Sequence, residues 1–169
     1  MKSFLLSLAA LALCGACSQN TGVTSPDGTI RLAFAVDSAG RMTYSVTDGD
    51  VRLFEPSRLG FEAAEADLGE GFAIENVSRT SVDETWTQPW GENKENRSRY
   101  NEMAVRLRND GGVRLTLRFR LFDDGLGFRY EYEVPGVDSL RIMDELTEFR
   151  FAADGDSWTI PVSYTHLRA

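Results

Sequence analysis

Apolar and polar residues alternate with a period of two along most of this chain. The alternation is clear over residues 30–36, repeats over 42–46 after the turn sequence DSAG, and begins again at 51–54 after TDGD. Residues 72–82 show a weaker version of it. Because this period is typical of half-buried strands, the sequence predicts β-strands over these ranges. The stretch AAEADLGEG between them is predicted to be a surface loop.

The strongest local signal is a hairpin over residues 113–134. Apolar residues alternate with polar residues, several of them arginines, up to Leu121, the sequence DDG follows, and aromatic residues alternate with charged ones from Phe128. Asp-Gly between two alternating runs is a strong hairpin signal. A two-residue turn at Asp124 and Gly125 would pair Leu121 with Phe128 and keep the apolar residues on one face.

The same register places charged residues on the opposite face. It pairs Arg118 with Glu131, which is favourable, and sets Arg120 opposite Arg129, which is unfavourable unless a carboxylate lies between them. We therefore expect one of these arginines to hold a carboxylate from elsewhere in the chain. The nearby candidates in the sequence DELTEF are Asp144, Glu145 and Glu148.

These elements favour an all-β fold, an antiparallel β-sandwich. No stretch has the period of a long amphipathic helix, and about ten short strands with evenly spaced turns are typical of sandwiches. The length of 169 residues suits one domain. With 42% apolar and 26% charged residues, the chain can bury a core.

Charge and cysteine usage narrow the possible partners. The formal net charge of -8 repels phosphate backbones, so we expect no nucleic-acid partner. Cys14 and Cys17 are the two cysteines, and both lie near the amino terminus, so the rest of the chain can form no internal disulfide. The single histidine, His166, cannot build a metal site by itself.

The first residues have the pattern of an export signal. Lys2 precedes the apolar run FLLSLAALAL, which is too short to span a bilayer. The following LCGACSQN resembles a bacterial lipoprotein box, in which Cys17 would be acylated. Plain signal-peptidase cleavage is the alternative. We predict a signal segment over residues 1–17, a linker over 18–24, and a protein exported to the periplasm or anchored at the outer membrane.

Two tryptophans lie in one of the most polar segments, DETWTQPWGENKENRSRYNE, residues 83–102. Trp86 and Trp90 could stack on sugar rings while Glu92 and neighbouring amides meet hydroxyl groups. Alternatively, the indoles could plug one end of the sandwich. Since most tryptophans are packing residues, the sequence alone favours the plug.

The end of this segment predicts a strand that begins near Arg99. Asn101 shares its parity with Met103 and is therefore expected to face inward. A buried amide must be hydrogen-bonded, so Asn101 is predicted to hold a loop in place.

The sequence DELTEF carries three carboxylates within five residues. Glycoside hydrolysis requires paired carboxylates, but on a strand Asp144 and Glu145 would point to opposite faces. A strand edge paired with arginines is the favoured interpretation. The chain has no nucleophile elbow, dinucleotide-binding glycine motif or P-loop.

Four sequence blocks occur together in a specific order: SPDGTIRL, DETWTQPWGENKENRSRYNE, FRLFDDGLGFRYEYE and MDELTEFRF. They resemble the amino-terminal domain of glycoside hydrolase family 97, which comprises bacterial α-glucosidases and α-galactosidases. The resemblance covers roughly Ser25 to Pro161. It implies a large sandwich of the galactose-mutarotase-like super-sandwich type, which packs on a (β/α)8 barrel. It also implies hydrolysis of terminal α-glucosides or α-galactosides, inverting or retaining, with calcium in the active site.

The resemblance assigns no catalytic or metal-binding residue to this chain, because the catalytic carboxylates and most calcium ligands of the family lie in the barrel. We therefore expect the chain alone to be inactive, with an oligosaccharide and the barrel as partners of the whole enzyme. A free-standing carbohydrate-binding lipoprotein is the alternative. The motif positions that could contact substrate or barrel are Trp86, Trp90, Glu92, Asn101, Asp124, Arg129 and Glu145.

The last residues depart from the family pattern. After WTIP the chain continues as VSYTHLRA, residues 162–169, which does not match the expected continuation of the sandwich. The sandwich predicted over residues 25–161 is therefore expected to be incomplete at its carboxyl end and to expose an unpaired β edge.

Overall fold

The computed structural model describes residues 21–155. The predicted signal segment with Cys17, His166 and the tail at 162–169 lie outside the described residues. Within residues 21–155 there is no helix that could cross a membrane.

All strand pairs in the described part of the chain are antiparallel, and they form three sheets. The first sheet has the order β1-β2-β3-β4 and comprises β1 (Thr21–Thr24), β2 (Ile30–Val36), β3 (Met42–Asp48) and β4 (Val51–Arg58). The second has the order β10-β9-β8-β7 and comprises β7 (Phe72–Thr87), β8 (Glu95–Asn109), β9 (Arg114–Phe122) and β10 (Gly125–Glu133). A small third sheet, β11-β5-β6, comprises β5 (Phe61–Ala63), β6 (Asp67–Leu68) and β11 (Ile142–Glu145).

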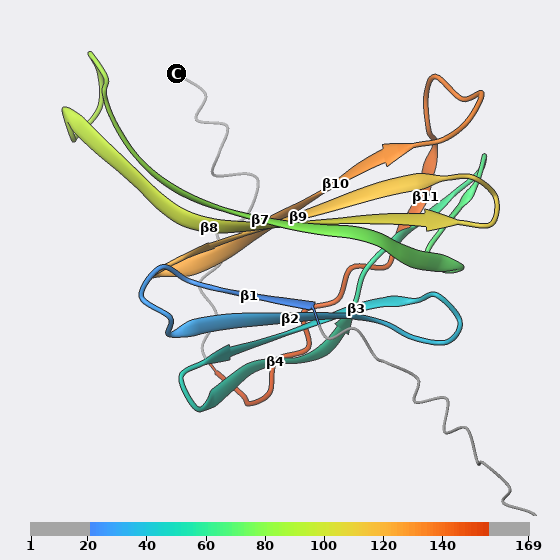
Figure 1. The fold of residues 1–169 in the computed structure, drawn as a ribbon, viewed down its shortest axis with the longest axis horizontal. Coiled ribbons are helices and arrows are strands. Elements are labelled where there is room, and N and C mark those ends of the chain that lie inside the picture. The colour runs from blue at the N-terminus through green and yellow to red at the C-terminus, as the bar shows by residue number, and fades with distance from the viewer. Residues whose placement is uncertain (1–20, 156–169) are drawn as a thin grey trace, which may run out of the picture.

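The two four-stranded sheets lie face to face and enclose the core, as Figure 1 shows. Phe34 of β2 and Phe119 of β9 meet across the interface with ring centroids 5.8 Å apart, and both are fully buried. The predicted antiparallel β-sandwich is thus confirmed. The buried residues that line it include Leu32, Phe34, Met42, Tyr44, Val46, Met103, Val105, Leu107, Leu115, Leu117, Phe119 and Leu121.

Several boundaries differ from the sequence prediction. The expected linker over 18–24 includes strand β1, which pairs with β2 along its whole length. The expected surface loop AAEADLGEG holds strand β6 and the end of β5. Strand β8 begins at Glu95 rather than near Arg99. In each case backbone pairing with a neighbouring strand orders a segment whose side chains carry little apolar periodicity.

The β9–β10 hairpin has the predicted strands but a different register. Its turn residues are Asp123 and Asp124, so Leu121 faces Leu126 and not Phe128. This shift of two residues keeps the alternating apolar side chains from Leu115 to Leu121 and from Leu126 to Tyr132 on the core face, while Phe122 lies on the outer face. Asp123 explains it, because its carboxylate accepts a hydrogen bond from the backbone of Asp27 at 2.9 Å. A contact with a distant turn thus overrides the local preference for glycine in the turn.

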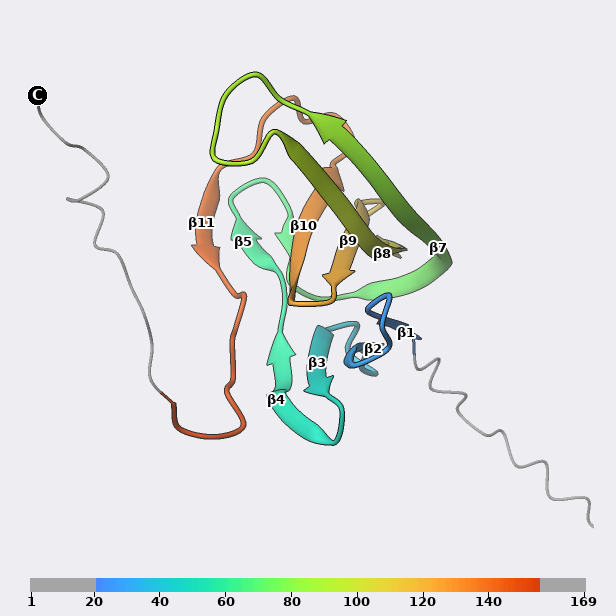
Figure 2. The same cartoon turned by 90° about the vertical axis from the view of Figure 1, so that its left-hand side faces the viewer.

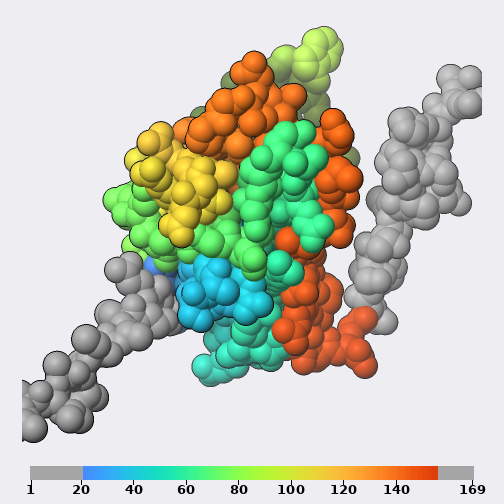
Figure 3. Space-filling model, turned by 90° about the vertical axis from the view of Figure 1, so that its right-hand side faces the viewer, coloured from blue at the N-terminus to red at the C-terminus, as the bar shows by residue number. Residues whose placement is uncertain are grey.

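The described chain after β11 runs beside β4, as Figure 2 shows. Backbone hydrogen bonds tie residues 146–152 to β4 and to Gly60, and Phe151 forms a β-bridge with Phe54. Figure 3 shows this red segment against the neighbouring atoms of the first sheet. Phe151 nevertheless leaves 73% of its side chain exposed. The edge of β4 is therefore covered, while aromatic side chains of the covering segment remain on the surface.

Inward-facing tyrosines of β10 connect the small third sheet and residues 146–152 to the sandwich. The Tyr132 hydroxyl donates to the carbonyl oxygen of Leu68 in β6 at 3.1 Å. The Tyr130 hydroxyl lies 2.8 Å from that of Thr147 and accepts a hydrogen bond from the Gly60 backbone. Burial raises the pKa of Tyr130 to about 12, so it stays a neutral, hydrogen-bonding group at physiological pH.

One glycine fixes how the two large sheets meet. Gly40, in the β2–β3 turn, has φ +75°, and its carbonyl oxygen accepts a hydrogen bond from the backbone of Phe72 at the start of β7. A Cβ at this position would overlap backbone atoms of Gly71 and Phe72. Gly28, in the β1–β2 turn, has a similar φ of +81° but open space around it.

We predict that Gly40→Ala destabilises the fold far more than Gly28→Ala. Both substitutions carry the cost of a left-handed alanine, about 1–2 kcal/mol, but only Gly40→Ala also pushes two backbones apart, which adds roughly 1–3 kcal/mol. Urea denaturation followed by circular dichroism measures both. Equal losses in the two variants would show that the approach of the β2–β3 turn to β7 does not matter for stability.

Candidate functional site

The β7–β8 hairpin extends beyond the sandwich and ends in an exposed tip, residues 86–95. Figure 1 shows this end of the hairpin curving away from the first sheet. The pairing continues to Thr87 and Glu95, and the backbone of Gln88 donates to the carbonyl oxygen of Lys94 at 3.1 Å to close the loop. Trp86 is 46% exposed and Trp90 is 84% exposed. The interpretation that these tryptophans plug the sandwich is therefore wrong.

The tip offers aromatic and polar groups without a preformed pocket. Trp86 lies at the end of β7, whereas Trp90 and Glu92 lie in the loop. Among the described residues, no ring contact joins the two indoles. Such a surface can stack on a sugar ring or pack against another domain, because an exposed indole gains from either partner.

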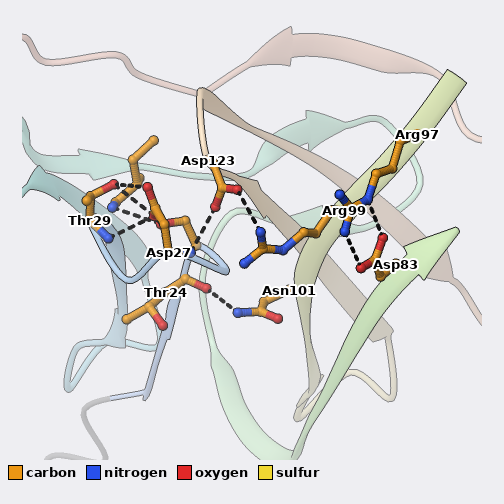
Figure 4. A network of polar contacts seen from close by, with 10 residues as sticks. Thr24, Asp27, Thr29, Asp83, Arg97, Arg99, Asn101 and Asp123 are labelled. Atoms are coloured by element: carbon orange, nitrogen blue, oxygen red, sulfur yellow. Dashed lines mark hydrogen bonds and ion pairs between the residues drawn. The ribbon is translucent and has the colours of Figure 1, made fainter.

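A cluster of charged residues holds the hairpin and two turns of the sandwich together, as Figure 4 shows. Within the hairpin, Arg97 binds Asp83 through two parallel hydrogen bonds of 2.7 and 2.6 Å. Arg99 lies 3.7 Å from Asp123 in the β9–β10 turn, which in turn accepts from the backbone of Asp27. The hydrogen bonds from Arg97 hold the pKa of Asp83 below its usual range. We call these five residues the junction.

Asn101 performs the pinning role that the sequence predicts. Its side-chain nitrogen donates to the carbonyl oxygen of Thr24 at 2.9 Å, which attaches β8 to the end of β1. Its side-chain oxygen accepts from the Ser81 hydroxyl at 2.7 Å, so both ends of the amide are used. A structural role thus accounts for this motif position.

Sequence reasoning missed the residues of the junction. For Asp27 a signal was available, because aspartate in a turn sequence such as SPDGT typically binds the backbone of its own turn. The Asp27 carboxylate accepts hydrogen bonds from the backbone and the hydroxyl of Thr29. Its pKa is lowered, chiefly by the hydrogen bond from Ser25. The contact between two distant turns has no local signal. The motif position Asp124 lies beside Asp123 in the same turn, but it is Asp123 that makes the contacts.

A ladder of five charged residues crosses the outer face of the second sheet, in the order Arg120, Glu102, Arg118, Glu131 and Arg129. Glu102 of β8 accepts from Arg120 at 2.8 Å and from Arg118 at 3.0 Å. Glu131 accepts from Arg118 at 2.8 Å and from Arg129 at 2.9 Å. We call this set the arginine ladder.

The ladder both confirms and corrects the sequence prediction. An arginine does hold a carboxylate from elsewhere, but the carboxylate is Glu102 and not Asp144, Glu145 or Glu148. The register shift places Arg129 opposite Arg118 instead of Arg120, and Glu131 relieves the repulsion by binding both. Burial acts to raise the pKa of Glu102, but the hydrogen bonds from Arg120 and Arg118 outweigh it and leave that pKa lowered.

The three carboxylates of DELTEF do not converge on an active site. Asp144 accepts from the backbone of Glu145 at 2.9 Å, and Glu148 accepts from the backbone of Arg58 at 3.1 Å. Within residues 21–155, none of the three forms an ion pair with an arginine, so the arginine-paired edge is wrong. Glu145 instead ends β11, where it pairs with Phe61 of β5.

The pKa shifts of the described carboxyl groups and the placement of metal-binding side chains bear on acid–base and metal chemistry. A glycosidase acid needs a carboxyl group with a raised pKa. The described carboxyl groups whose pKa is clearly shifted are all shifted downward, and they are Asp27, Asp37, Asp83, Glu102 and Glu131. Between residues 21 and 155, no group of three His, Cys, Asp or Glu side chains is placed to hold a metal ion.

The comparisons with known proteins decide the family. The family model described as "Glycosyl-hydrolase 97 N-terminal" matches residues 23–168. The chain belongs to this family. A probable retaining alpha-galactosidase from Streptomyces bingchenggensis is 31% identical over 121 residues, which are 72% of this chain and 19% of that protein.

Solved structures agree with this assignment. A family 97 enzyme from Pseudoalteromonas sp. strain K8, solved in complexes with panose and with acarbose, is 34% identical with a TM-score of 0.73. The match covers 78% of this chain and 20% of that enzyme. A beta-arabinopyranosidase is 28% identical with a TM-score of 0.69, over 79% of this chain and 21% of that one. The chain thus spans about a fifth of the length of these relatives.

We predict that Glu102→Gln lowers the free energy of unfolding of this family 97 domain by about 1–3 kcal/mol at pH 7, because a charged hydrogen-bond acceptor for two arginines is lost. The matched control is Glu133→Gln on the same face, whose exposed pair with Arg114 at 3.8 Å should cost less than about 0.5 kcal/mol. Urea denaturation measures both.

The difference between wild type and Glu102→Gln should depend on pH. Since the folded pKa of Glu102 is lowered, its contribution is complete above the unfolded pKa and disappears as pH falls through the folded pKa. The two proteins should therefore converge in stability in acid. A constant difference down to pH 3 would contradict the role given to the ionised carboxylate.

Proposed function

We propose that this chain is the non-catalytic amino-terminal sandwich of an exported hydrolase that acts on terminal α-glucosides or α-galactosides. One observation carries the proposal. The family model matches residues 23–168, and this chain spans only about a fifth of the length of its relatives. The relatives supply the sugar chemistry by analogy: one is a probable alpha-galactosidase, and another was solved with panose and with acarbose.

The charged groups of the chain support a structural role. The shifted carboxylates are held ionised by arginines or turn hydrogen bonds, so they serve as acceptors and not as proton donors. In the proposed enzyme the reacting carboxylates, together with the calcium ion expected for the family, belong to the catalytic barrel. The sandwich would supply a docking surface for that barrel.

The hairpin tip is one exposed part of the described chain that suits such a contact. Arg97 and Asp83 join the two strands of the hairpin, and Arg99 contacts the β9–β10 turn. Trp86 and Trp90 remain exposed at the end of the hairpin. Backbone pairing that continues to Thr87 and Glu95 orders this arm, and an ordered arm loses less conformational entropy when a partner covers it. Export and acylation at Cys17 complete the proposal, supported by the apolar run that precedes this cysteine.

We predict that the purified chain does not hydrolyse p-nitrophenyl α-glucoside or α-galactoside, with or without added calcium. The positive control is the Pseudoalteromonas relative, assayed under the same conditions. Turnover by this chain that persists after repeated chromatography, and that is lost in Glu145→Gln, would contradict the non-catalytic role.

The exposure of Trp86 and Trp90 favours a second candidate, a free-standing carbohydrate-binding module. The two candidates differ in a titration of tryptophan fluorescence with panose. If the tip serves only in docking, tryptophan fluorescence should stay unchanged up to sugar concentrations on the order of 10 mM. The two indoles make no ring contact with each other, so they do not form a preorganised sugar-binding platform. A saturable change that disappears in Trp90→Ala, while a galactose titration gives none, would favour the binding module.

A further inference from the structure

A small cavity lies on the outer face of the second sheet, beside the arginine ladder. Its volume is about 160 Å³, and its lining includes Arg118, Arg120, Phe122, Gly127 and Arg129. Cavities that hold drug-sized ligands are several times larger. The cavity therefore suits a small ligand. It is built from β9 and β10 and contains none of the residues of the hairpin tip.

The cavity is electropositive although the protein is acidic. Three guanidinium groups of the ladder share two carboxylates, Glu102 and Glu131, which leaves an excess of one positive charge. The whole chain, in contrast, carries a formal charge of -8. The side chains of the three arginines are 31–62% exposed. One monovalent anion would balance their excess of one positive charge.

The ladder leaves hydrogen-bond donors available. Arg118 uses Nε and one terminal nitrogen, and Arg120 uses Nε. Arg129 uses Nε and one terminal nitrogen on Glu131. Among the described residues, no hydrogen bond or ion pair engages the other terminal nitrogens of these three arginines. Each of the three arginines that line the cavity therefore keeps at least one terminal nitrogen for a ligand.

Neighbouring residues keep the cavity open and its arginines in place. Gly127 lies opposite Arg120 in the β9–β10 ladder, and a Cβ built on it meets nothing within 4 Å. A larger residue would project into this space. Arg120 lies over the ring of Tyr100, 4.6 Å from its centroid, and Glu102 holds its Nε. The guanidinium of Arg120 is therefore positioned before any ligand arrives.

We propose that this cavity binds the carboxylate group of a small monoanion. Guanidinium groups form parallel paired hydrogen bonds with planar carboxylates, and the single excess charge matches one such group. Phe122 supplies an apolar wall for the remainder of the ligand. The carboxylate could belong to a simple organic acid or to a uronic acid, and the experiment below separates these sources.

The test is a titration of the ¹⁵N-labelled chain followed by amide NMR. Sodium acetate and sodium galacturonate are each compared with galactose and with sodium chloride at the same ionic strength. Both carboxylates should shift the Gly127 amide saturably, with a dissociation constant on the order of 1–10 mM. Tighter binding of galacturonate by threefold or more identifies a uronic acid as the ligand, and equal affinities identify the carboxylate group alone. Shifts equal to those in sodium chloride would overturn the proposal.

Matched variants tie the binding to the cavity. Gly127→Val fills the space without removing a charge and should weaken binding at least tenfold, whereas Gly125→Val on the same face should leave it unchanged. Arg129→Gln removes the excess charge while Arg118 still holds Glu131, and it should also weaken binding at least tenfold. Circular dichroism confirms that each variant is folded. Unaltered affinity in folded Gly127→Val would place the anion elsewhere and overturn the proposal.

Discussion

The burial of two apolar sheet faces against each other is the constraint on which the rest of this structure depends. No cysteine lies between residues 21 and 155, so packing and hydrogen bonding alone hold the sheets together there. Phe34 and Phe119 meet at the centre of the interface, and each belongs to a strand that buries every second residue. Because successive side chains of a strand point to opposite faces of the sheet, the burial of one face also determines which side chains face outward. The arginine ladder on the outer face is therefore a consequence of how the core is packed.

The sequence was sufficient for the strands that carry this alternation, for the sandwich and for the family. It was insufficient where partners distant along the chain decide the outcome. Asp123 moves the β9–β10 turn by contacting another turn, and Glu102 reaches the arginines from a neighbouring strand. Strand β1 has a polar sequence and is ordered by its pairing with β2. For the candidate site, Asn101 was predicted correctly as a pin, whereas the exposure of Trp86 and Trp90 follows from the length of the hairpin, which sequence periodicity did not reveal.

Charged side chains of this domain pair with one another, whereas two tryptophans stay exposed. Arginines hold Asp83, Glu102 and Glu131 in the ionised state, and turn hydrogen bonds do the same for Asp27. The tryptophans lie at the end of a hairpin that contacts the β9–β10 turn through Arg99. This chain spans about a fifth of the length of its family 97 relatives, and we propose that the remainder carries the chemistry.

The most direct measurement of this central claim is the DNA sequence of the gene beyond the codon for Ala169, combined with the mass of the protein that its source produces. The account predicts an open frame that encodes a further region with paired carboxylates and a product about five times as long as the matched domain, in keeping with the relatives. A stop codon at that point, together with a stable native product of 169 residues, would contradict it.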